Sequence, residues 1–490
     1  MGKDLNAQHN HDQDYVRAIC DFMRIATMFS LNMFYWNPVG RWISGYERQY
    51  WDCIKRAHHF TNTVIAERAE ALRKGEVEST SLTGRANRCA KLGHDTMKLW
   101  LLHECFVTPI TGKAIKAILD SNEEITKGFD YDVIVPWLGR GLLTSTGAKW
   151  HSRRRLITPT FHFSMLDGYI TAMNRHARVF VDDIIADITG KEHDFYPNIR
   201  RCTLDIICET AMGKELDCQH NTTHPYLTAV LKILGVALNV VGRPLLWSKT
   251  IRRITGHESE FKANVKIAHN FTRTVISERI EALERGEVEA SKRTFLDLLI
   301  AQMGAEKLSV EDLREEVETF MFEGYDTTAS GLSWIIWCLA CNTEIQQRAY
   351  EEIKKIFGDD LDRDATKEDL HSMHYLEMCI KEAMRLFPPV PIVTRKLQNE
   401  FKSGDNLLPV GAIVSICPIA VHRNETIYKD ALNECIPRQR FAMYEEKVLM
   451  SWLLRRYSFH SSMKIHDNPP IAEGVLRPKF GCLVTMQKRQ

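Results

Sequence analysis

The most informative part of the chain is residues 315–334, which read EEVETFMFEGYDTTASGLSW. Apolar residues recur around its first half at helical spacing, which predicts a helix with one buried face. A glycine, Gly324, stands in the middle of this helix, where it costs on the order of 1 kcal/mol relative to alanine. An acid and two hydroxyls, Asp326, Thr327 and Thr328, follow it closely.

Gly324 lets another group approach the helix backbone closely, and a threonine hydroxyl can bend a helix by bonding back to a carbonyl. A groove opened beside an acid and an alcohol suits the delivery of protons to a bound ligand. The simpler interpretation is a buried helix whose glycine serves packing and whose polar residues are solvated. This stretch alone leaves both interpretations open.

Length and composition narrow the class of protein. At 490 residues the chain holds one large domain or about two to four ordinary ones. Apolar residues make up 44% and charged residues 26%, which argues against wholesale disorder. The net charge of +1 gives no reason to expect a nucleic acid as partner. The thirteen cysteines lack the pattern of a disulfide scaffold. Cys338 and Cys341 lie on an apolar helical run with no second pair nearby, which favours core packing over a zinc site.

We expect no signal peptide and no membrane-spanning segment. The N-terminus is polar, and the first apolar patch, residues 22–36, is too short to cross a bilayer and carries Arg24 and Asn32. A second apolar run within residues 225–250 fits either a buried helix or a membrane-touching lip over a binding site.

The chain contains one internal repeat. Residues 1–78 align without a gap to residues 212–289, and 32 of the 78 aligned positions are identical. A single repeat does not make a solenoid, which needs at least three units. We interpret residues 1–78 as a partial duplicate of an interior helical segment, residues 79–96 as a junction, and residues 97–490 as the main domain.

The main domain is predicted to be mainly α-helical with a minor β-sheet. Residues 97–108 fit one or two strands, and residues 137–150 fit a loop punctuated by glycines. Helical patterns cover residues 165–215, 225–250, 260–286 and 309–357. After a proline-rich stop, residues 392–420 alternate like short strands.

Two short groups of charged residues are candidate binding or bracing elements. Trp150 and Arg154 would share one face of a helix and could grip a carboxylate on a partly apolar ligand. The simpler alternative is that Trp150 and Arg154 lie at the solvated start of a basic helix. Glu382 and Arg385 lie one turn apart, and a buried pair of this kind is more often a structural brace than a catalyst.

A lone cysteine, Cys435, precedes a helical pattern that contains several arginines. A cysteine at a helix N-terminus near arginines tends toward the thiolate form, which suits a ligand to iron.

Three motifs occur in the order of a known family: EGYDTT at residues 323–328, EAMR at 382–385 and CIPRQRFA at 435–442. They resemble the signature of a cytochrome P450. The sequences of residues 320–334 and 126–154 are similar to those of the fatty-acid-hydroxylase-like family 4 of that superfamily, in its insect-type branch. The resemblance covers residues 97–430 and resumes over 433–490. It implies the cytochrome P450 fold, a haem, and electrons from NADPH through a reductase.

The resemblance also implies roles for single residues. Cys435 would be the axial thiolate that binds the haem iron. Asp326 and Thr327 would relay protons for the activation of dioxygen. Glu323 matches a position at which many members of the family form an ester to the haem.

Further haem contacts follow from the same resemblance. Trp150, Arg154 and Arg395 would hold a haem propionate. Glu382 and Arg385 would form the scaffold pair under the haem.

The chain departs from the family pattern just before the cysteine. Residues 428–435 read YKDALNEC, so the glycine-rich loop FxxGxR and the arginine that completes the Glu–Arg brace are missing. Pro437 and Arg438 stand where the family has a single glycine. A family member without its N-terminal anchor and part of its haem-binding loop is the expected architecture.

Three functions therefore compete. The first is a haem-thiolate mono-oxygenase that acts on a fatty acid or similar lipophile, either fully active or impaired by the missing loop. The second is an inactive or haem-free relative, and the third is a helical binding or scaffold protein. The partners implied for the first are a lipophilic substrate, NADPH-cytochrome P450 reductase and a membrane surface, without nucleic acid. The implied location is peripheral, on the cytosolic face of the endoplasmic reticulum.

Overall fold

The chain divides into two units, Met1–Arg88 and Cys89–Gln490. The computed structural model describes residues 21, 25, 44, 46–56, 89–90, 93–101, 104–158, 163–288, 293–306, 308–424, 440–465 and 467–489. The described part of the first unit includes a helical segment over residues 46–56, in which Arg56 Nε lies 3.0 Å from Asp52 Oδ2. Most of the predicted duplicate and junction lies outside the described residues, so the boundaries 1–78, 79–96 and 97–490 stay predictions.

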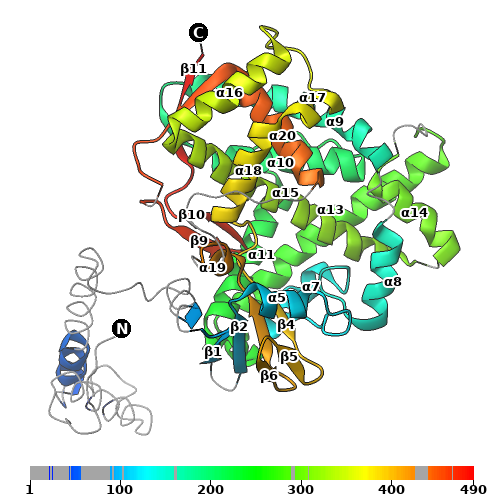
Figure 1. Ribbon diagram of the computed structural model, residues 1–490. Coiled ribbons are helices and arrows are strands. Elements are labelled where there is room, and N and C mark those ends of the chain that lie inside the picture. The colour runs from blue at the N-terminus through cyan, green and yellow to red at the C-terminus, as the bar shows by residue number, and fades with distance from the viewer. Residues whose placement is uncertain are drawn as a thin grey trace. The chain divides into compact units, whose positions relative to one another are not determined.

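The second unit is mainly helical, as predicted (Figure 1). Its α-helices are α5 (Gly112–Leu119), α6 (Phe129–Asp132), α7 (Val135–Leu138), α8 (Gly147–Ile157), α9 (Phe163–Val179), α10 (Tyr196–Met212), α11 (Pro225–Gly242), α12 (Lys249–Ile254), α13 (His257–Glu284), α14 (Phe295–Glu306), α15 (Val310–Cys341), α16 (Thr343–Phe357), α17 (Lys367–Ser372), α18 (His374–Leu386), α19 (Pro418–His422) and α20 (Arg440–Arg456). Shorter turns are the π turn η3 (Phe180–Ile184) and the 3-10 turns η4 (Ala186–Ile188) and η5 (Pro244–Trp247).

The strands form small sheets at the edges of the helical body. They are β1 (Thr96–Leu101), β2 (Glu104–Pro109), β3 (Glu192–Asp194), β4 (Val393–Lys396), β5 (Phe401–Ser403), β6 (Asn406–Leu408), β7 (Ile413–Ile416), β8 (Tyr457–His460), β9 (Pro470–Glu473), β10 (Val475–Pro478) and β11 (Leu483–Lys488). The largest sheet has the order β1-β2-β7-β4, in which β2 and β7 are parallel and the other pairs antiparallel. This sheet positions Arg395, since it lies on β4 opposite Val414.

Helix α15 runs through the middle of the second unit and belongs to both of its large hydrophobic clusters (Figure 1). Its N-terminal part, from Leu313 to Tyr325, packs with α10, α11, α13 and α14. Its C-terminal part, from Ala329 to Ala340, packs with α9, α10, α18 and α20. The helix begins at a capping box, in which Asp312 N donates to Ser309 Oγ and Ser309 N donates to the Asp312 carboxylate. The cap fixes where α15 starts, and burial on most sides fixes its rotation.

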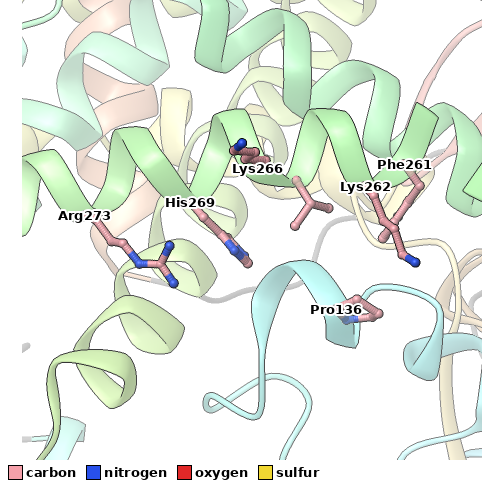
Figure 2. Close-up of a pocket in the computed structure, with 7 residues that line it drawn as sticks. Pro136, Phe261, Lys262, Lys266, His269 and Arg273 are labelled. Carbon is pink, nitrogen blue, oxygen red and sulfur yellow. The ribbon is translucent and has the colours of Figure 1, made fainter. Parts of the chain in front are cut away.

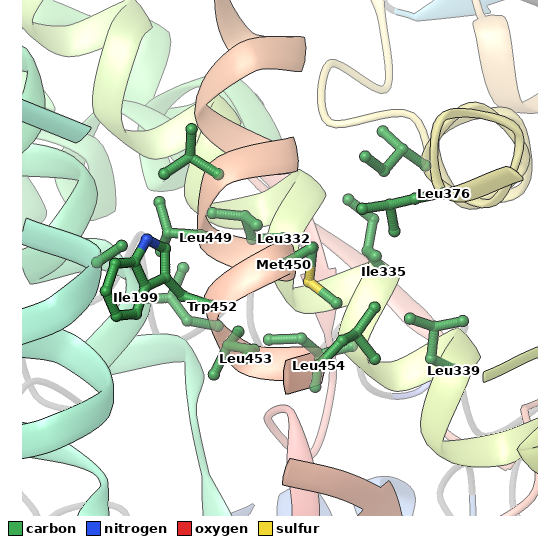
Figure 3. Packing of buried hydrophobic residues seen from close by; sticks show 14 of the residues in the cluster. Ile199, Leu332, Ile335, Leu339, Leu376, Leu449, Met450, Trp452, Leu453 and Leu454 are labelled. Carbon is green, nitrogen blue, oxygen red and sulfur yellow. The ribbon is translucent and has the colours of Figure 1, made fainter. Parts of the chain in front are cut away.

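Helix α20 fills the space between α10, α15 and α18 (Figure 3). Its Leu449 and Trp452 side chains meet Ile199 of α10 and Leu332 of α15 in one apolar cluster. All four residues are almost completely buried. Burial of each such side chain contributes about 1.5–3 kcal/mol, so this contact holds the helices together.

The predicted secondary structure is confirmed in most places and wrong in three. The helix predicted at 225–250 is broken, because α11 ends at Gly242 and the 3-10 turn η5 separates it from α12. Residues 165–215 are not continuously helical, because η3, η4 and β3 interrupt the helix and Asp194 of β3 pairs with Leu483 of β11. Residues 137–150 are not all loop, since α7 extends to Leu138 and α8 begins at Gly147. The strands predicted at 97–108 and 392–420 and the helices at 309–357 are present.

Helix α11 covers most of the apolar run within residues 225–250, for which the sequence allowed either a buried helix or a membrane-touching lip. Among the described residues it is the one helix long and apolar enough to cross a membrane. Half of that window is buried inside the protein, and α11 packs along α13 within a hydrophobic cluster. This packing is that of a core helix.

Glu445 and Glu446 of α20 are buried carboxyls that have no hydrogen-bond partner among the residues the structure describes. Burial raises the pKa of both well above the usual range, and the neighbouring Glu445 raises that of Glu446 further. Below the ordinary carboxyl pKa both the folded and unfolded chains hold these protons. As pH rises above it, the unfolded chain releases them and the folded chain does not, so stability falls with rising pH.

We predict that Glu446→Gln makes the folded protein more stable at pH 8 by about 1–3 kcal/mol, and by less at pH 5, because the amide has no proton to release. Urea unfolding at both pH values measures this difference. The exposed Glu284→Gln is the control and should leave the pH slope unchanged. An unaltered slope in Glu446→Gln would show that this carboxyl is ionised in the folded chain.

Gly324 marks a close approach between α15 and α10. A Cβ added there would lie 2.8 Å from Ile207 Cγ1, which no real Cβ contact tolerates without movement. We predict that Gly324→Ala costs about 1–3 kcal/mol and that combining it with Ile207→Ala costs less than the sum of the single changes.

Urea unfolding of the two single variants and the double variant tests this packing. Gly235→Ala on α11 is the matched control, since nothing lies within 4 Å of its added Cβ. That change should be neutral or stabilising by about 0.5–1 kcal/mol. Strict additivity of Gly324→Ala and Ile207→Ala would contradict the proposed contact.

Candidate active site

One face in the middle of α15 is partly open, whereas most of the helix around it is buried. Three residues on this face, Phe320, Glu323 and Thr327, recur at the spacing of one helical face and are each partly exposed. Thr327 Oγ1 donates to the Glu323 carbonyl at 2.5 Å, and Thr328 Oγ1 donates to the Gly324 carbonyl at 2.8 Å. The predicted back-bonding of the threonine hydroxyls is therefore confirmed.

The Glu323 carboxyl carries an unusual charge state. Burial raises its pKa to about 7, although the nearby Lys127 cation opposes the shift. Burial also lowers the pKa of Lys127 to about 8, with Arg395 adding to the effect. The open face of α15 therefore has a carboxyl and two cations near it, all with incomplete solvation.

Arg395 and Lys127 reach this region from neighbouring segments. The segment that carries Lys127 is fixed to β4, because Lys396 N donates to the Thr126 carbonyl at 2.9 Å and Thr394 Oγ1 donates to Asp130 Oδ1 at 2.6 Å. Arg395 is half-buried, its Nη1 donates to the Thr394 carbonyl at 3.0 Å, and burial lowers its pKa. Two poorly solvated cations suit an anionic group such as a carboxylate.

Asp326 lies on the side of α15 that faces α10, rather than on the open face. Its Oδ1 accepts hydrogen bonds from Arg200 Nε at 2.9 Å and from the Tyr196 hydroxyl at 3.2 Å. Its Oδ2 is buried and has no hydrogen-bond partner within the described ranges of the chain. The acid and Thr327 are thus adjacent in sequence but point in different directions. Sequence reasoning missed Arg200, which no local spacing connects to Asp326.

Helix α8 positions the two predicted propionate ligands differently. Trp150 is half-buried and packs edge-on against His151, with ring centroids 5.2 Å apart. Arg154 is exposed. The two residues share a helix as predicted, while their role toward a haem stays a prediction.

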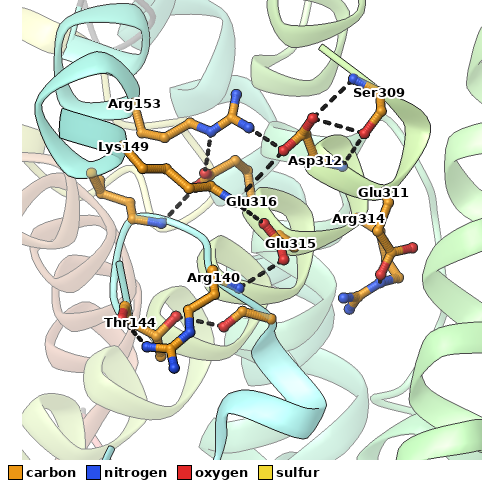
Figure 4. A network of polar contacts seen from close by, with 12 residues as sticks. Arg140, Thr144, Lys149, Arg153, Ser309, Glu311, Asp312, Arg314, Glu315 and Glu316 are labelled. Carbon is orange, nitrogen blue, oxygen red and sulfur yellow. Dashed lines mark hydrogen bonds and ion pairs between the residues drawn. The ribbon is translucent and has the colours of Figure 1, made fainter. Parts of the chain in front are cut away.

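The buried arginine of α8 is Arg153, which sequence reasoning missed (Figure 4). It contacts the Asp312 carboxylate, and its Nε lies 3.5 Å from Glu316 Oε1. Lys149 Nζ lies 2.8 Å from Glu315 Oε2 in the same network. The signal in the sequence was the group of acidic residues at the start of α15, because carboxylates that become buried require cations from another segment to compensate their charge.

Glu382 and Arg385 form the predicted pair at the end of α18. Arg385 Nε and Nη2 donate to the two Glu382 oxygens at 2.8 and 2.7 Å. Arg385 Nη1 donates to the His422 carbonyl at 2.6 Å. The guanidinium is therefore satisfied by a fork-shaped ion pair and a backbone carbonyl.

Cys435 lies outside the described residues. Within the ranges the structure describes, no group of three or more His, Cys, Asp or Glu side chains could hold a metal ion. Cys338 and Cys341 pack against a hydrophobic cluster, and burial raises the pKa of the Cys341 thiol to about 11, which agrees with core packing.

Among the described residues, those near the open face of α15 suit one edge of a haem. Lys127 interacts electrostatically both with Glu323 on the partly open α15 face and with Arg395, and the two cations match the acidic edge of a haem in charge. Glu323 lies on the same face, and burial raises the pKa of its carboxyl to about 7.

Known proteins resemble the chain over most of its length. A family model described as Cytochrome P450 matches residues 76–433. Cytochrome P450 4c3 of Drosophila melanogaster is 36% identical, over 77% of this chain and 79% of that protein. Human Cytochrome P450 4V2 is 34% identical, over 80% and 82%. Cytochrome P450 4c21 of Blattella germanica is 35% identical, over 74% and 80%.

These similarities agree with the expected fold of mainly α structure and small sheets. The three relatives named above are all numbered in family 4, as the sequences of residues 320–334 and 126–154 predicted. The chain therefore belongs to the cytochrome P450 family, the haem-thiolate mono-oxygenases that receive electrons from a reductase.

Proposed function

We propose that this chain inserts one oxygen atom of dioxygen into a fatty acid or a similar lipophilic substrate. The observation that carries the proposal is the partly open α15 face beside two poorly solvated cations. When bound, the haem would activate dioxygen so that one atom enters a C–H bond of the substrate and the other leaves as water, with two electrons from NADPH through the reductase and two protons.

The residues divide into those that hold the haem and those that move protons. Cys435 is proposed as the axial thiolate and Arg395, Trp150 and Arg154 as propionate ligands. Half-burial of Arg395 and Trp150 supports their part in this set. Glu323 is proposed to form an ester to the haem, since it lies on the open face of α15.

Asp326 and Thr327 are proposed to deliver protons. Thr327 lies on the open face, and Asp326 lies behind it with its Oδ1 held by Arg200 and Tyr196. The unpartnered Oδ2 of Asp326 is the oxygen available to exchange a proton. The fixed Oδ1 would keep that oxygen in one orientation.

A second candidate function is that of an inactive relative that binds lipophiles or other proteins without haem. The short segment at residues 428–435, which lacks the FxxGxR loop, favours it. The Glu382–Arg385 pair supports a stable fold in either case, because Arg385 Nη1 also donates to the His422 carbonyl. Glu382 and Arg385 are proposed as the scaffold pair under the haem.

Turnover of a medium-chain fatty acid with NADPH and purified reductase tests the first function. We predict a hydroxylated product from the unaltered chain and none from Cys435→Ala, because loss of the thiolate removes the iron ligand. Cys105→Ala on β2 is the control and should retain the product. Product from Cys435→Ala would refute the assignment of the ligand, and absence of both haem and product in the unaltered chain would favour the inactive relative.

We also propose peripheral attachment to the cytosolic face of the endoplasmic reticulum and a role in lipid metabolism. The exposed Leu245 and Ile254, which are 76% and 80% exposed, lie beside the basic residues Arg252 and Arg253 and support a membrane-touching surface.

We predict that alkaline carbonate releases the chain from microsomes, because α11, the one described helix long and apolar enough to cross a membrane, packs as a core helix. Immunoblots of the pellet and supernatant measure the release, with a membrane-spanning resident protein as control. Retention in the pellet would mean that a segment of the chain spans the bilayer.

A further inference from the structure

A second candidate binding site lies on α13. A pocket of about 370 Å³ lies between this helix and Pro136 of α7 (Figure 2). Phe261 and Val265 are buried and form its apolar side together with Pro136. No residue of this pocket belongs to the open face of α15.

Four basic residues follow one side of α13 along this pocket: Lys262, Lys266, His269 and Arg273. Their spacing of four, three and four positions places them in one stripe on the helix. The pocket therefore combines an apolar wall with a cationic rim.

The cations of the rim are only weakly paired. Lys262 Nζ lies 3.1 Å from Glu258, which is partly buried. Arg273 Nη2 lies 3.4 Å from Glu311, and both of these side chains are exposed. In the part of the chain that the structure describes, Lys266 has no ion-pair partner. Exposed pairs contribute about 0–1 kcal/mol, so a bound anion can compete with Glu311 for Arg273.

The backbone acceptor nearest this rim is already used. The Trp137 carbonyl accepts hydrogen bonds from His269 Nε2 at 2.7 Å and from Arg314 Nη1 at 3.0 Å. Both lone pairs of the carbonyl are thereby engaged. The charged groups that line the pocket are all cations, which favours an anion over a cation as ligand.

We propose that this pocket binds a free anionic amphiphile, with its carboxylate at Lys266 and Arg273 and its alkyl part against Phe261 and Val265. The volume of about 370 Å³ is near the lower end for small-molecule sites, which suits a medium-chain carboxylate rather than a whole phospholipid. This binding is separate from catalysis and does not depend on the haem or on the proposed substrate.

Isothermal titration of the full chain with decanoate tests the proposal, and decanol is the neutral ligand of matched length. We predict that decanoate binds and that Lys266→Gln/Arg273→Gln weakens one binding event by about tenfold or more, which corresponds to 1.4 kcal/mol. The exposed Lys232→Gln on α11 is the control and should change nothing. A decanoate site near α15 would appear as a second event that the double variant leaves intact.

The single variant Lys266→Gln carries the test if the double variant does not fold, since Lys266 is exposed. Roughly threefold weaker binding is then expected for the loss of one exposed charge. Equal decanoate affinity in the variants and the unaltered chain would overturn the proposal, as would equal affinity for decanol. Binding to anionic phospholipid vesicles without binding to decanoate would overturn it too. Unchanged turnover in these variants separates this result from a failure of the proposed oxygenation.

Discussion

Two contacts between α15 and α10 fix the position on which the candidate active site depends. Ile207 of α10 lies where a side chain at Gly324 would be, so the helices meet at close range. Beside this contact, Arg200 and Asp326 form a buried ion pair with an N–O distance of 2.9 Å. Removal of one partner from a buried pair typically costs about 3–5 kcal/mol, because the other charge is left without compensation. Together the two contacts set both the rotation and the register of α15, and thereby place Glu323 and Thr327 on the open face.

The charges around that face depend on one another. Glu323 has a pKa of about 7 and Lys127 a pKa of about 8, and each moves the other toward its charged form. An anionic group bound at Lys127 and Arg395 would raise the pKa of Lys127 and also that of Glu323. Near neutral pH it would therefore favour the charged form of Lys127 and the protonated form of Glu323. Low solvation raises the free energy of these charged side chains, and for the same reason it suits them to hold a charged edge of a cofactor.

Sequence reasoning succeeded where local patterns decide the structure. The helical period predicted α15, and the spacing of Glu382 and Arg385 predicted an ion pair that is present. It failed where contacts between segments far apart in the sequence decide the structure. Asp326 and Arg200 are 126 positions apart, and β3 forms because β11 pairs with it, so neither feature has a local signal. In α8 the spacing of Trp150 and Arg154 pointed to Arg154, which is exposed. The buried arginine is Arg153, because it pairs with the acidic residues at the start of α15.

The central claim is that a chain with a shortened segment before Cys435 still binds haem through that cysteine, opposite the open face of α15. The reduced, carbon-monoxide-bound difference spectrum of the full-length protein tests it most directly, because the position of the main absorption band reports the ligand on the iron. The account predicts the long-wavelength band of a thiolate-ligated haem. A band typical of a haem without a thiolate, or no haem absorption after reconstitution with haem, would contradict it.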